Sequence, residues 1–412
     1  MVTLLAVFLS HKIRLYPNDK QVSYLKRACG IKRFAYNWAL AESRKLYEQG
    51  IKTSGYDLSK RFNAIKREQF PFVLEVSKWV SQKAIYDLED AYKNWWSKRA
   101  RAPKFKKKGK CKDSFYLAND ATKTVEHRIY ISKCGWVRMS QSLRFPGHVM
   151  SVVISSEYAK WHASIQVELD GTWSCPHTCK TQAVCGLDMG VRDLVVLDDG
   201  TKYLAPRSLR KSEKKLKRLN RVVSRRVKGS NRRKKAVHIL SRVHEKVTNI
   251  RKDCIHKITA KLVEDYRIIG MEDLNVKGMI KNHHLAKSVS DAAFGTVKSQ
   301  LEYKTELSGS VLVKADRFYP SSKMCSNCGH VLDTLPLRIR VWTCPGCGAV
   351  HDRDVNAAKN LLNVALRYKE TVNARGVESS GTGDFTSTKL STVKRVPGSR
   401  RPTVVSVQVR GS

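Results

Sequence analysis

Two pairs of cysteines late in the chain restrict its fold more than any other feature. Each pair has the spacing Cys-x2-Cys, and 15 residues separate the pairs, which is the spacing of a zinc ribbon. Such a turn directs two thiolates to one point, and two turns complete a tetrahedron around zinc. Because four thiolates leave no open coordination position, we expect a structural zinc ion. Its expected ligands are Cys325, Cys328, Cys344 and Cys347.

The other cysteines show no disulfide framework, although the chain has 11 cysteines in all. This usage is typical of a reducing compartment. A redox role for the two Cys-x2-Cys pairs is the alternative to zinc. Two matched pairs, each followed by a glycine where a tight turn needs positive φ, favour the metal. The remaining cysteines are Cys29, Cys111, Cys134, Cys175, Cys179, Cys185 and Cys254.

The balance of charge indicates a polyanionic partner. The chain has 78 Lys and Arg against 36 Asp and Glu, which gives a formal net charge of +42. Such a surplus repels itself unless something neutralises it, and nucleic acid is the expected partner. An anionic membrane surface is the alternative, but we find no long amphipathic segment with an aromatic face. No apolar run approaches the roughly 20 residues of a membrane helix, so we expect a cytoplasmic protein without a membrane partner.

Positive charge is concentrated in two segments. Residues 98–112 contain nine Lys or Arg and no acidic residue, and Pro103 and Gly109 within them predict a loop. Residues 205–261 contain 21 Lys or Arg against three acidic residues, while apolar residues recur every three or four positions. Since Gly229 interrupts this pattern, we expect an antiparallel helical hairpin. A merely solvated hairpin is the alternative, but the one-sided charge favours binding to a phosphate backbone.

Hydrophobic periodicity divides the rest of the chain into further regions. Residues 19–98 are expected to be helical, with a break at 50–55. Short strands between turn residues in 114–169 predict a small barrel or half-barrel. Beyond residue 368 the chain has no periodicity, and a disordered basic tail is expected. Between these regions, strands are expected at 184–191, 193–197, 201–204, 266–271 and 310–318, with helices between them.

Three acidic residues stand at the ends of apolar segments. Asp188 lies in the expected strand 184–191, Glu272 follows Met271, and Asp354 stands where a helix begins after the cysteine pairs. Burying a carboxylate is costly unless it is paired or binds metal. Three convergent carboxylates would suit Mg²⁺, and two such ions would activate water in phosphodiester cleavage. From the residues alone each acid is more often a helix cap or an ion-pair partner than a catalytic group, and spacing in sequence proves no convergence in space.

Several segments together resemble the TnpB family of transposon-encoded, RNA-guided DNA endonucleases, which are similar to the compact type V CRISPR effectors. The resemblance covers about residues 11–366, and the motifs occur in the family's order. In the second half they are VCGLDMGVRDLVVLDDG, IIGMEDL, YPSSKMCSNCG, WTCPGCG and HDRDVNAAKNLL. In the first half they are HKIRLYPNDKQ, RFAYNWAL, AYKNWW and PKFKKKGK.

This resemblance implies an α/β fold with an RNase H-like (RuvC) core, an inserted zinc ribbon, a helical recognition domain and a small β-barrel wedge domain. The implied divisions are a first wedge strand at 1–16, the recognition domain and basic loop at 17–112, the wedge barrel at 113–181, the nuclease core at 182–321 with its basic hairpin at 205–261, the zinc ribbon at 322–350, the third RuvC motif at 351–366, and a disordered basic tail at 367–412.

The family's metal-binding acids match Asp188, Glu272 and Asp354, which implies a Mg²⁺ site, with two ions, for DNA cleavage. Asp352 belongs to the same motif as Asp354, but the family's ligand is the acid two residues before Asn356. Because all three acids are present, an RNA-guided repressor without cleavage is disfavoured. An accessory transposase is the other alternative.

The implied partners are a guide RNA from the transposon end and target double-stranded DNA, bound by a monomeric protein in a nucleoid-associated ribonucleoprotein. Lys78 and Gln82 resemble helix positions that approach the duplex beside the target, where glutamine suits adenine in the major groove. In the basic loop we expect Phe105 to anchor the chain by packing. The expected backbone contacts there are Lys104, Lys106, Lys107 and Lys108.

Overall fold

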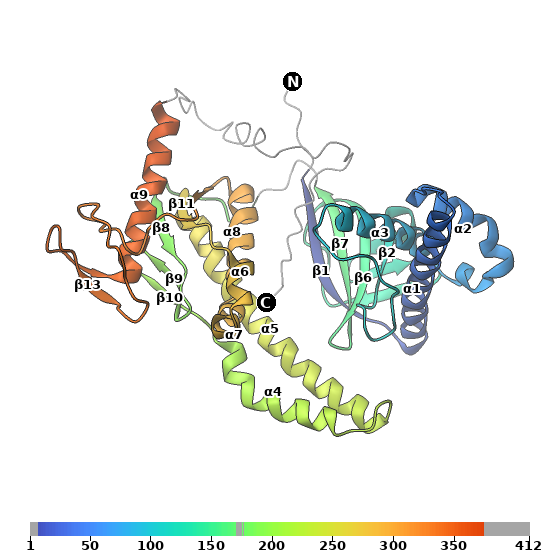
Figure 1. The fold of residues 1–412 in the computed structure, drawn as a ribbon. Helices are drawn as coiled ribbons and strands as arrows, with labels where there is room; N and C mark the ends of the chain where they lie inside the picture. Colours follow the sequence, from blue (N-terminus) through green and yellow to red (C-terminus); the bar gives the residue numbers. More distant parts are fainter. Residues whose placement is uncertain (1–6, 170–174, 176, 375–412) are drawn as a thin grey trace. The chain divides into compact units, whose positions relative to one another are not determined.

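The structure is a computed structural model that describes residues 7–169, 175 and 177–374. The described residues form two compact units, divided between residues 169 and 175. Each unit has its own sheet and helices (Figure 1).

The first unit contains an antiparallel sheet of seven strands in the order β2-β6-β7-β1-β5-β4-β3. The first strand in sequence lies at its centre, because β1 pairs with both β7 and β5. Alternate residues of β1 are buried, among them Leu9, Ile13 and Leu15, so one face of the strand packs on the core. The strands are β1 (Phe8–Tyr16), β2 (Ser114–Ala118), β3 (Thr122–Val125), β4 (Arg128–Ile131), β5 (Gly135–Met139), β6 (Gly147–Glu157) and β7 (Lys160–Leu169).

The seven-stranded sheet does not close into a barrel through backbone hydrogen bonds between the described strands. In the described part of the chain the ladder ends at β2 on one side and at β3 on the other, and no pairing joins these two strands. The sheet therefore matches the half-barrel alternative rather than a closed barrel. Helix α3 packs against β2, the strand at one end of this ladder.

Three helices complete this unit: α1 (Asp19–Glu48), α2 (Gly55–Gln69) and α3 (Lys78–Trp96), with a 3-10 turn at Pro71–Glu75. The starts of α1 and α2 follow from local chemistry, because Asn18 and Ser54 each form a capping box with the residue three positions later. Helix α1 packs on α3. Residues 97–113 then form the expected basic loop.

The second unit is built on a five-stranded sheet in the order β10-β9-β8-β11-β12. Strands β8, β11 and β12 are parallel, whereas β8, β9 and β10 form an antiparallel meander. The carboxyl ends of β8 and β11 thus lie at the same edge. The strands are β8 (Val184–Asp188), β9 (Asp193–Leu197), β10 (Lys202–Leu204), β11 (Ile268–Glu272) and β12 (Val311–Ala315), and a small pair is formed by β13 (Val341–Thr343) and β14 (Val350–Asp352).

Helices cover both faces of this sheet (Figure 1). Helices α5 and α8 contribute to the main core on one face, and α9 packs on the other. Helices α4 and α5 form the expected hairpin, with the break at 225–230. The helices are α4 (Ser208–Ser224), α5 (Asn231–Asp265), α6 (Val276–Lys281), α7 (His283–Ala292), α8 (Phe294–Ser308) and α9 (Arg353–Ala374).

Helix α9 corrects the expected start of the tail at residue 367. The helix continues to Ala374, because Ala365 and Tyr368 pack against Ile268 and Val311 of the sheet. Residues 367–374 are therefore helical. The rest of the expected tail, 375–412, lies outside the described residues.

Two glycines allow α9 to lie directly on the sheet. A Cβ placed on Gly186 would stand 1.8 Å from the carbonyl oxygen of Ala358 and 2.3 Å from the amide nitrogen of Leu362. A Cβ on Gly270 would stand 2.3 Å from the carbonyl oxygen of Leu361. No real Cβ fits at such distances, so only glycine permits this backbone-to-backbone contact.

We predict that Gly186→Ala lowers the free energy of unfolding by about 3 kcal/mol or more, because the methyl group must push backbone aside rather than a flexible side chain. The matched control is Gly295→Ala on α8, where the nearest atom to a new Cβ is 3.9 Å away, and which should be neutral or stabilising by up to about 1 kcal/mol. Thermal and denaturant unfolding measure both. Equal stability of the two variants would show that α9 does not lie this close to β8.

Candidate active site and metal centre

Three carboxylates from distant parts of the sequence lie at one edge of the second sheet. Asp188 is the last residue of β8 and Glu272 the last of β11. These strands are parallel neighbours with Leu187 opposite Met271, so both acids leave the sheet at the same level. Asp354 enters from the first turn of α9, which the glycine contacts hold against the same strands.

The pKa of Asp188 is affected by both of the other acids. Its side chain is buried, with a relative exposure of 9%. Burial raises the pKa of Asp188, and the negative charges of Glu272 and Asp354 raise it further, to about 8. The three groups thus share one electrostatic environment that disfavours three negative charges at once and favours a bound cation.

Neighbouring side chains already engage two of these acids. Arg340, just before β13, donates to both carboxylate oxygens of Asp354 at 3.0 and 3.3 Å. The hydroxyl of Ser321 donates to Glu272. Among the described residues only the four cysteines bring three or more ligand atoms within 4.8 Å of one another. At least one pair of the three carboxylates therefore lies further apart than that.

Asp352 has a different role from Asp354. Its carboxylate accepts hydrogen bonds from the backbone N–H groups of Asp354 and Val355, at 3.0 and 3.1 Å, so it caps the amino end of α9. It also forms an ion pair with Lys202 at 3.0 Å. A cap at this position fixes the first turn of the helix and with it the place of Asp354.

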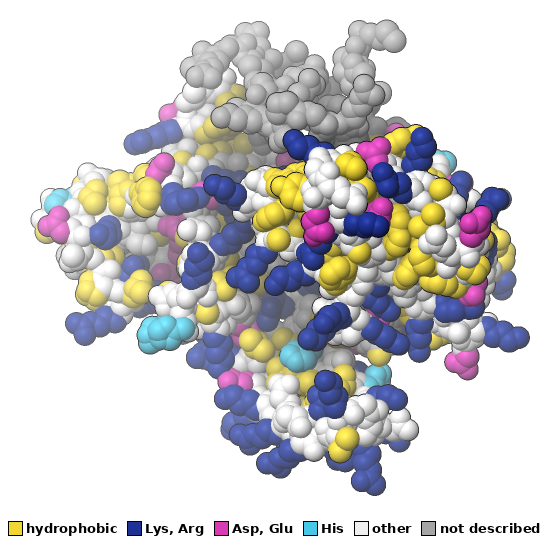
Figure 2. Space-filling view, turned by 45° about the vertical axis from the view of Figure 1, so that its right-hand side comes forward, with side chains coloured by type: hydrophobic (Ala, Val, Ile, Leu, Met, Phe, Trp, Pro, Cys, Tyr) yellow, Lys and Arg dark blue, Asp and Glu magenta, His cyan; other side chains and the backbone are white. Residues whose placement is uncertain are grey.

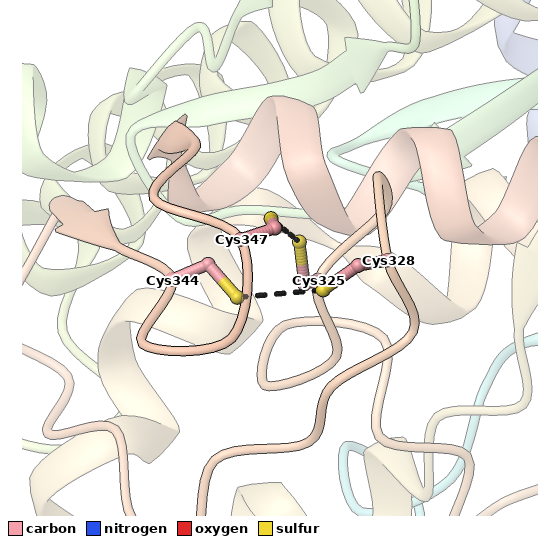
Figure 3. Close-up of side chains that lie close together, drawn as sticks. All are labelled: Cys325, Cys328, Cys344 and Cys347. Carbon is pink, nitrogen blue, oxygen red and sulfur yellow. Dashed lines mark hydrogen bonds between the residues drawn. The ribbon is translucent and has the colours of Figure 1, made fainter.

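The four cysteines converge as the spacing predicted (Figure 3). The Sγ atoms of Cys325 and Cys347 are 3.7 Å apart, and those of Cys328 and Cys344 are 3.6 Å apart. A tetrahedron of thiolates with Zn–S bonds of about 2.3 Å has edges of about 3.8 Å. The donor set and its dimensions therefore fit a structural zinc ion.

The two knuckles repeat the same backbone pattern. Gly329 N–H donates to the Cys325 carbonyl and Gly348 N–H to the Cys344 carbonyl, both at 2.9 Å. Both glycines have positive φ, 79° and 73°, and a Cβ at either position would meet no other atom within 4 Å. Backbone strain rather than crowding therefore favours glycine there. Hydrogen bonds from the Ala349 backbone and the Asn327 side chain lower the pKa of Cys347, whereas hydrogen bonds among the thiols raise the pKa of Cys328, so Cys347 is the more readily ionised of the two.

A histidine supports the first knuckle. Nε2 of His351 lies 3.0 Å from Sγ of Cys325, and its ring packs on Trp342, its cross-strand partner in the β13–β14 pair, with ring centroids 4.8 Å apart. Burial lowers the pKa of His351. A neutral imidazole has one N–H to donate, and with a thiolate at Cys325 that donor is Nε2.

The expected duplex-facing pair lies at the start of α3. Lys78 and Gln82 are four residues apart and so share one face of the helix. Lys78 is exposed and forms an ion pair with Asp120 at 3.2 Å, and its ammonium lies 5.3 Å from the ring of Trp79. Gln82 is half-buried.

The basic loop is held by hydrogen bonds to its backbone rather than by the expected packing of Phe105. Phe105 is 46% exposed and lies under the guanidinium of Arg44 rather than in a core. The backbone of Lys106 is held instead by the side-chain amide of Asn37, which exchanges two hydrogen bonds with it at 2.7 and 3.0 Å. Polar contacts with the backbone thus fix the loop, and the side chains of Lys104, Lys106, Lys107 and Lys108 are exposed.

A row of arginines on the first sheet was not expected from the sequence. Strand pairing sets Tyr16 opposite Arg138, and Arg138 opposite Arg128. The guanidinium of Arg14 lies 4.7 Å from the ring centroid of Tyr16, and that of Arg138 lies 6.0 Å from it. In the described chain these three arginines form no ion pair, and Arg128 and Arg138 border a hollow of about 800 Å³ that Glu126 also lines. Like charges directly opposite each other destabilise a sheet unless an anion lies between them.

The helical hairpin presents a further basic surface. Figure 2 shows dark blue Lys and Arg side chains gathered over the lowest part of the view, where α4 and α5 lie in Figure 1. Few acids are available to pair with them, and Glu213 of α4 is already engaged by Lys217 and Lys287.

Family comparisons identify the chain. A family model described as "Probable transposase" matches residues 163–283, one described as "Cas12f1-like, TNB domain" matches 294–361, and one described as "Helix-turn-helix domain" matches 7–52, where the structure has β1 and one continuous helix, α1. A protein from Streptomyces pristinaespiralis, named "Putative RNA-guided DNA endonuclease", is 37% identical over 86% of this chain and 89% of its own length. The chain belongs to the TnpB family.

Another relative agrees with this assignment, and two solved structures share the fold. A relative of the same description from Escherichia coli is 33% identical over 85% of this chain and 90% of its own length. A Cas12f1–sgRNA–target DNA complex has a similar fold, with a TM-score of 0.55, 12% identity and coverage of 87% of this chain and 99% of that one. An RNA-guided endonuclease described as CRISPR-Cas_phi3 matches with a TM-score of 0.50, 10% identity and coverage of 88% and 92%.

A search of the described residues for helices long and apolar enough to cross a membrane finds none.

We predict that Asp188→Asn stabilises the protein in Mg²⁺-free buffer, and more so as the pH rises. Asp188 keeps its proton up to about pH 8 in the folded protein, against about 3.8 in the unfolded chain. The folded state therefore binds more protons across this window and loses stability as the pH rises through it. The amide removes that loss, so the free energy of unfolding at pH 8 should increase by about 1 kcal/mol or more.

Melting temperatures between pH 5 and about 8 measure this effect. The control is Asp333→Asn, which changes an exposed carboxylate of the same unit and should leave the pH profile unchanged. If Asp188→Asn follows the wild-type profile, the charge of Asp188 is not buried beside the other two acids.

Proposed function

We propose that this TnpB-family protein is an RNA-guided DNA endonuclease of the RuvC type. It binds a guide RNA from the transposon end, recognises a short motif beside the target, and cleaves double-stranded DNA by Mg²⁺-dependent hydrolysis at Asp188, Glu272 and Asp354. The observation that carries the proposal is the convergence of these carboxylates at one sheet edge, close enough for two of them to raise the pKa of the third.

The fold around the acids supports this assignment. The sheet order β10-β9-β8-β11-β12, with an antiparallel meander followed by two parallel strands, agrees with the RNase H-like (RuvC) core that the resemblance implies. Catalytic groups at the carboxyl ends of adjacent parallel strands, beside a helix, occupy the usual place for a site in an α/β sheet.

The residues at this site have two different roles, metal binding and charge neutralisation. Asp188, Glu272 and Asp354 offer the hard oxygen ligands that Mg²⁺ prefers. When bound, the metal would supply Lewis acidity and a water of lowered pKa. Arg340, whose side chain is 63% exposed, neutralises Asp354 before the cation binds and can then turn to a phosphate oxygen of the DNA, since a guanidinium suits both.

The nucleic-acid partners are supported by charge and by the named relatives. The similar proteins are named as RNA-guided DNA endonucleases, and the similar Cas12f1 structure is a complex with sgRNA and target DNA. In this chain the basic loop, the α4–α5 hairpin and the arginine row would hold phosphate backbones. Base pairing by the guide would supply sequence specificity, which explains so much charge beside so few base-reading motifs.

We predict that Asp188→Ala lowers the rate of target cleavage by a ribonucleoprotein with its guide RNA by at least about 100-fold, with guide and target binding retained. The measurement is cleavage of a plasmid carrying the target and adjacent motif, with Mg²⁺ present, after the bound RNA has been sequenced to identify the guide. The control is Asp333→Asn, which should cleave at the wild-type rate.

Other outcomes of this assay would support other functions. Retained cleavage by Asp188→Ala would refute the proposed triad. Tight target binding without cleavage by the wild-type protein would indicate an RNA-guided repressor. Joined transposon ends in the absence of RNA would indicate a transposase, the activity that the family model over 163–283 describes.

We predict that the double variant Arg128→Gln and Arg138→Gln weakens guide-RNA binding about tenfold and reduces the slope of log K against log salt by about 1 for each phosphate that the protein no longer neutralises. The reason is that these arginines have no carboxylate partner in the described chain. The control, Lys45→Gln and Lys60→Gln, removes the same charge from exposed positions of α1 and α2. An equal weakening in the control would mean that net charge alone sets the affinity.

A further inference from the structure

Two buried asparagines on α9 hold the first zinc knuckle. Asn356 and Asn360 are each 1% exposed, and because they are four residues apart they lie on one face of the helix. Their side chains reach the backbone of residues 321–326, which leads into the knuckle that begins at Cys325.

The hydrogen bonds are specific. Nδ2 of Asn356 donates to the Met324 carbonyl at 2.7 Å, and its Oδ1 accepts from the Ser326 N–H at 2.9 Å. Nδ2 of Asn360 donates to the carbonyls of Ser321 and Met324, at 2.8 and 2.6 Å. Met324 and Ser326 flank the ligand Cys325. Side chains of the helix therefore form hydrogen bonds with the backbone on both sides of a zinc-binding thiolate.

The same segment reaches the carboxylate site. Ser321, whose carbonyl accepts from Asn360, donates its own hydroxyl to Glu272. Asp354 stands on α9 half a turn before Asn356. Two of the three acids are therefore joined to the zinc knuckle by short paths, one through a hydroxyl and one along a helix.

We propose that Asn356 and Asn360 are positioning residues that couple zinc at the four cysteines to cation binding by Asp188, Glu272 and Asp354. Zinc fixes the position of the knuckle. The two asparagine side chains connect the knuckle to α9, which carries Asp354, and to Ser321, which donates to Glu272. This inference rests on the proposed function, because it assigns the cation to the three acids.

An amide suits position 356. Asn356 must donate to one backbone carbonyl and accept from one backbone N–H at the same time, which an ionised aspartate or a leucine cannot do. Without it the partly buried Ser326 N–H would lose its side-chain partner, and the Met324 carbonyl would keep only the hydrogen bond from Asn360. A helix and a metal loop that needed only to touch could do so with apolar side chains.

Coupling of two cation sites is reciprocal. If zinc favours the arrangement that binds Mg²⁺, then Mg²⁺ must tighten zinc binding by the same factor. A residue that only stabilises the fold would change how much protein is folded without changing how one metal affects the other.

The test measures zinc release at equilibrium, as the share of zinc that the full-length protein gives up to a colorimetric chelator, with and without Mg²⁺ at matched ionic strength. In the wild type, Mg²⁺ should lower the equilibrium constant for release about fivefold or more. In Asn356→Ala and in Asn360→Ala, initial zinc content should remain at one ion per chain, but Mg²⁺ should no longer lower this constant. The matched control is Asn363→Ala, on the same helix but outside the buried pair, which should behave as wild type.

A second readout uses cleavage. Asn356→Ala should raise the Mg²⁺ concentration for half-maximal cleavage about fivefold or more, with a maximal rate at saturating Mg²⁺ close to that of wild type. Variants that keep the wild-type Mg²⁺ effect on zinc release overturn the proposal. Absence of any Mg²⁺ effect on zinc release in the wild type also refutes the coupling, whether or not a variant folds.

The two proposals fail in different ways. Zinc release does not depend on guide RNA or cleavage, so a protein that shows the Mg²⁺ effect without cutting DNA would refute the proposed endonuclease and retain the coupling. A protein that cuts DNA at Asp188 but shows no Mg²⁺ effect on zinc release would do the opposite.

Discussion

The close approach of α9 to the central sheet is the contact on which the rest of the second unit depends. Gly186 and Gly270 remove the side chains that would otherwise separate the helix from β8 and β11. The helix can therefore carry Asp354 to the edge where two parallel strands end. Two of its buried side chains, Asn356 and Asn360, donate to the backbone that leads into the zinc knuckle. One backbone packing contact thus connects the sheet, the third acid and the cysteine cluster.

This arrangement has an electrostatic cost. Three carboxylates share one environment, and the buried Asp188 keeps its proton far above the usual pH range for an aspartate. Arg340 and Ser321 reduce the repulsion by engaging Asp354 and Glu272. A divalent cation would relieve it further, so the repulsion that destabilises the folded protein is the same feature that would attract the metal.

Positive charge is distributed over both units, and local backbone contacts determine where the basic side chains lie. The amide of Asn37 fixes the basic loop by its backbone, which leaves the lysines free to face solvent. On the first sheet, strand register sets Arg138 between Arg128 and Tyr16. Such a row is unfavourable for an isolated protein and favourable once a phosphate backbone neutralises it, with the exposed ring of Tyr16 available for stacking.

The sequence by itself determined what depends on local chemistry. The spacing of the cysteines predicted that their four thiols converge. Capping residues such as Asn18 and Ser54 determined where helices begin. The order of the motifs identified the family. The sequence misplaced the start of the tail, because Tyr368 packs against Ile268 and Val311, on strands that lie far earlier in the chain. Only the tertiary structure decided that Asp188, Glu272 and Asp354 meet, that Arg340 binds one of them, and that Arg128 faces Arg138. These contacts depend on strand register and helix crossing between segments far apart in the chain, which no local pattern of residues encodes.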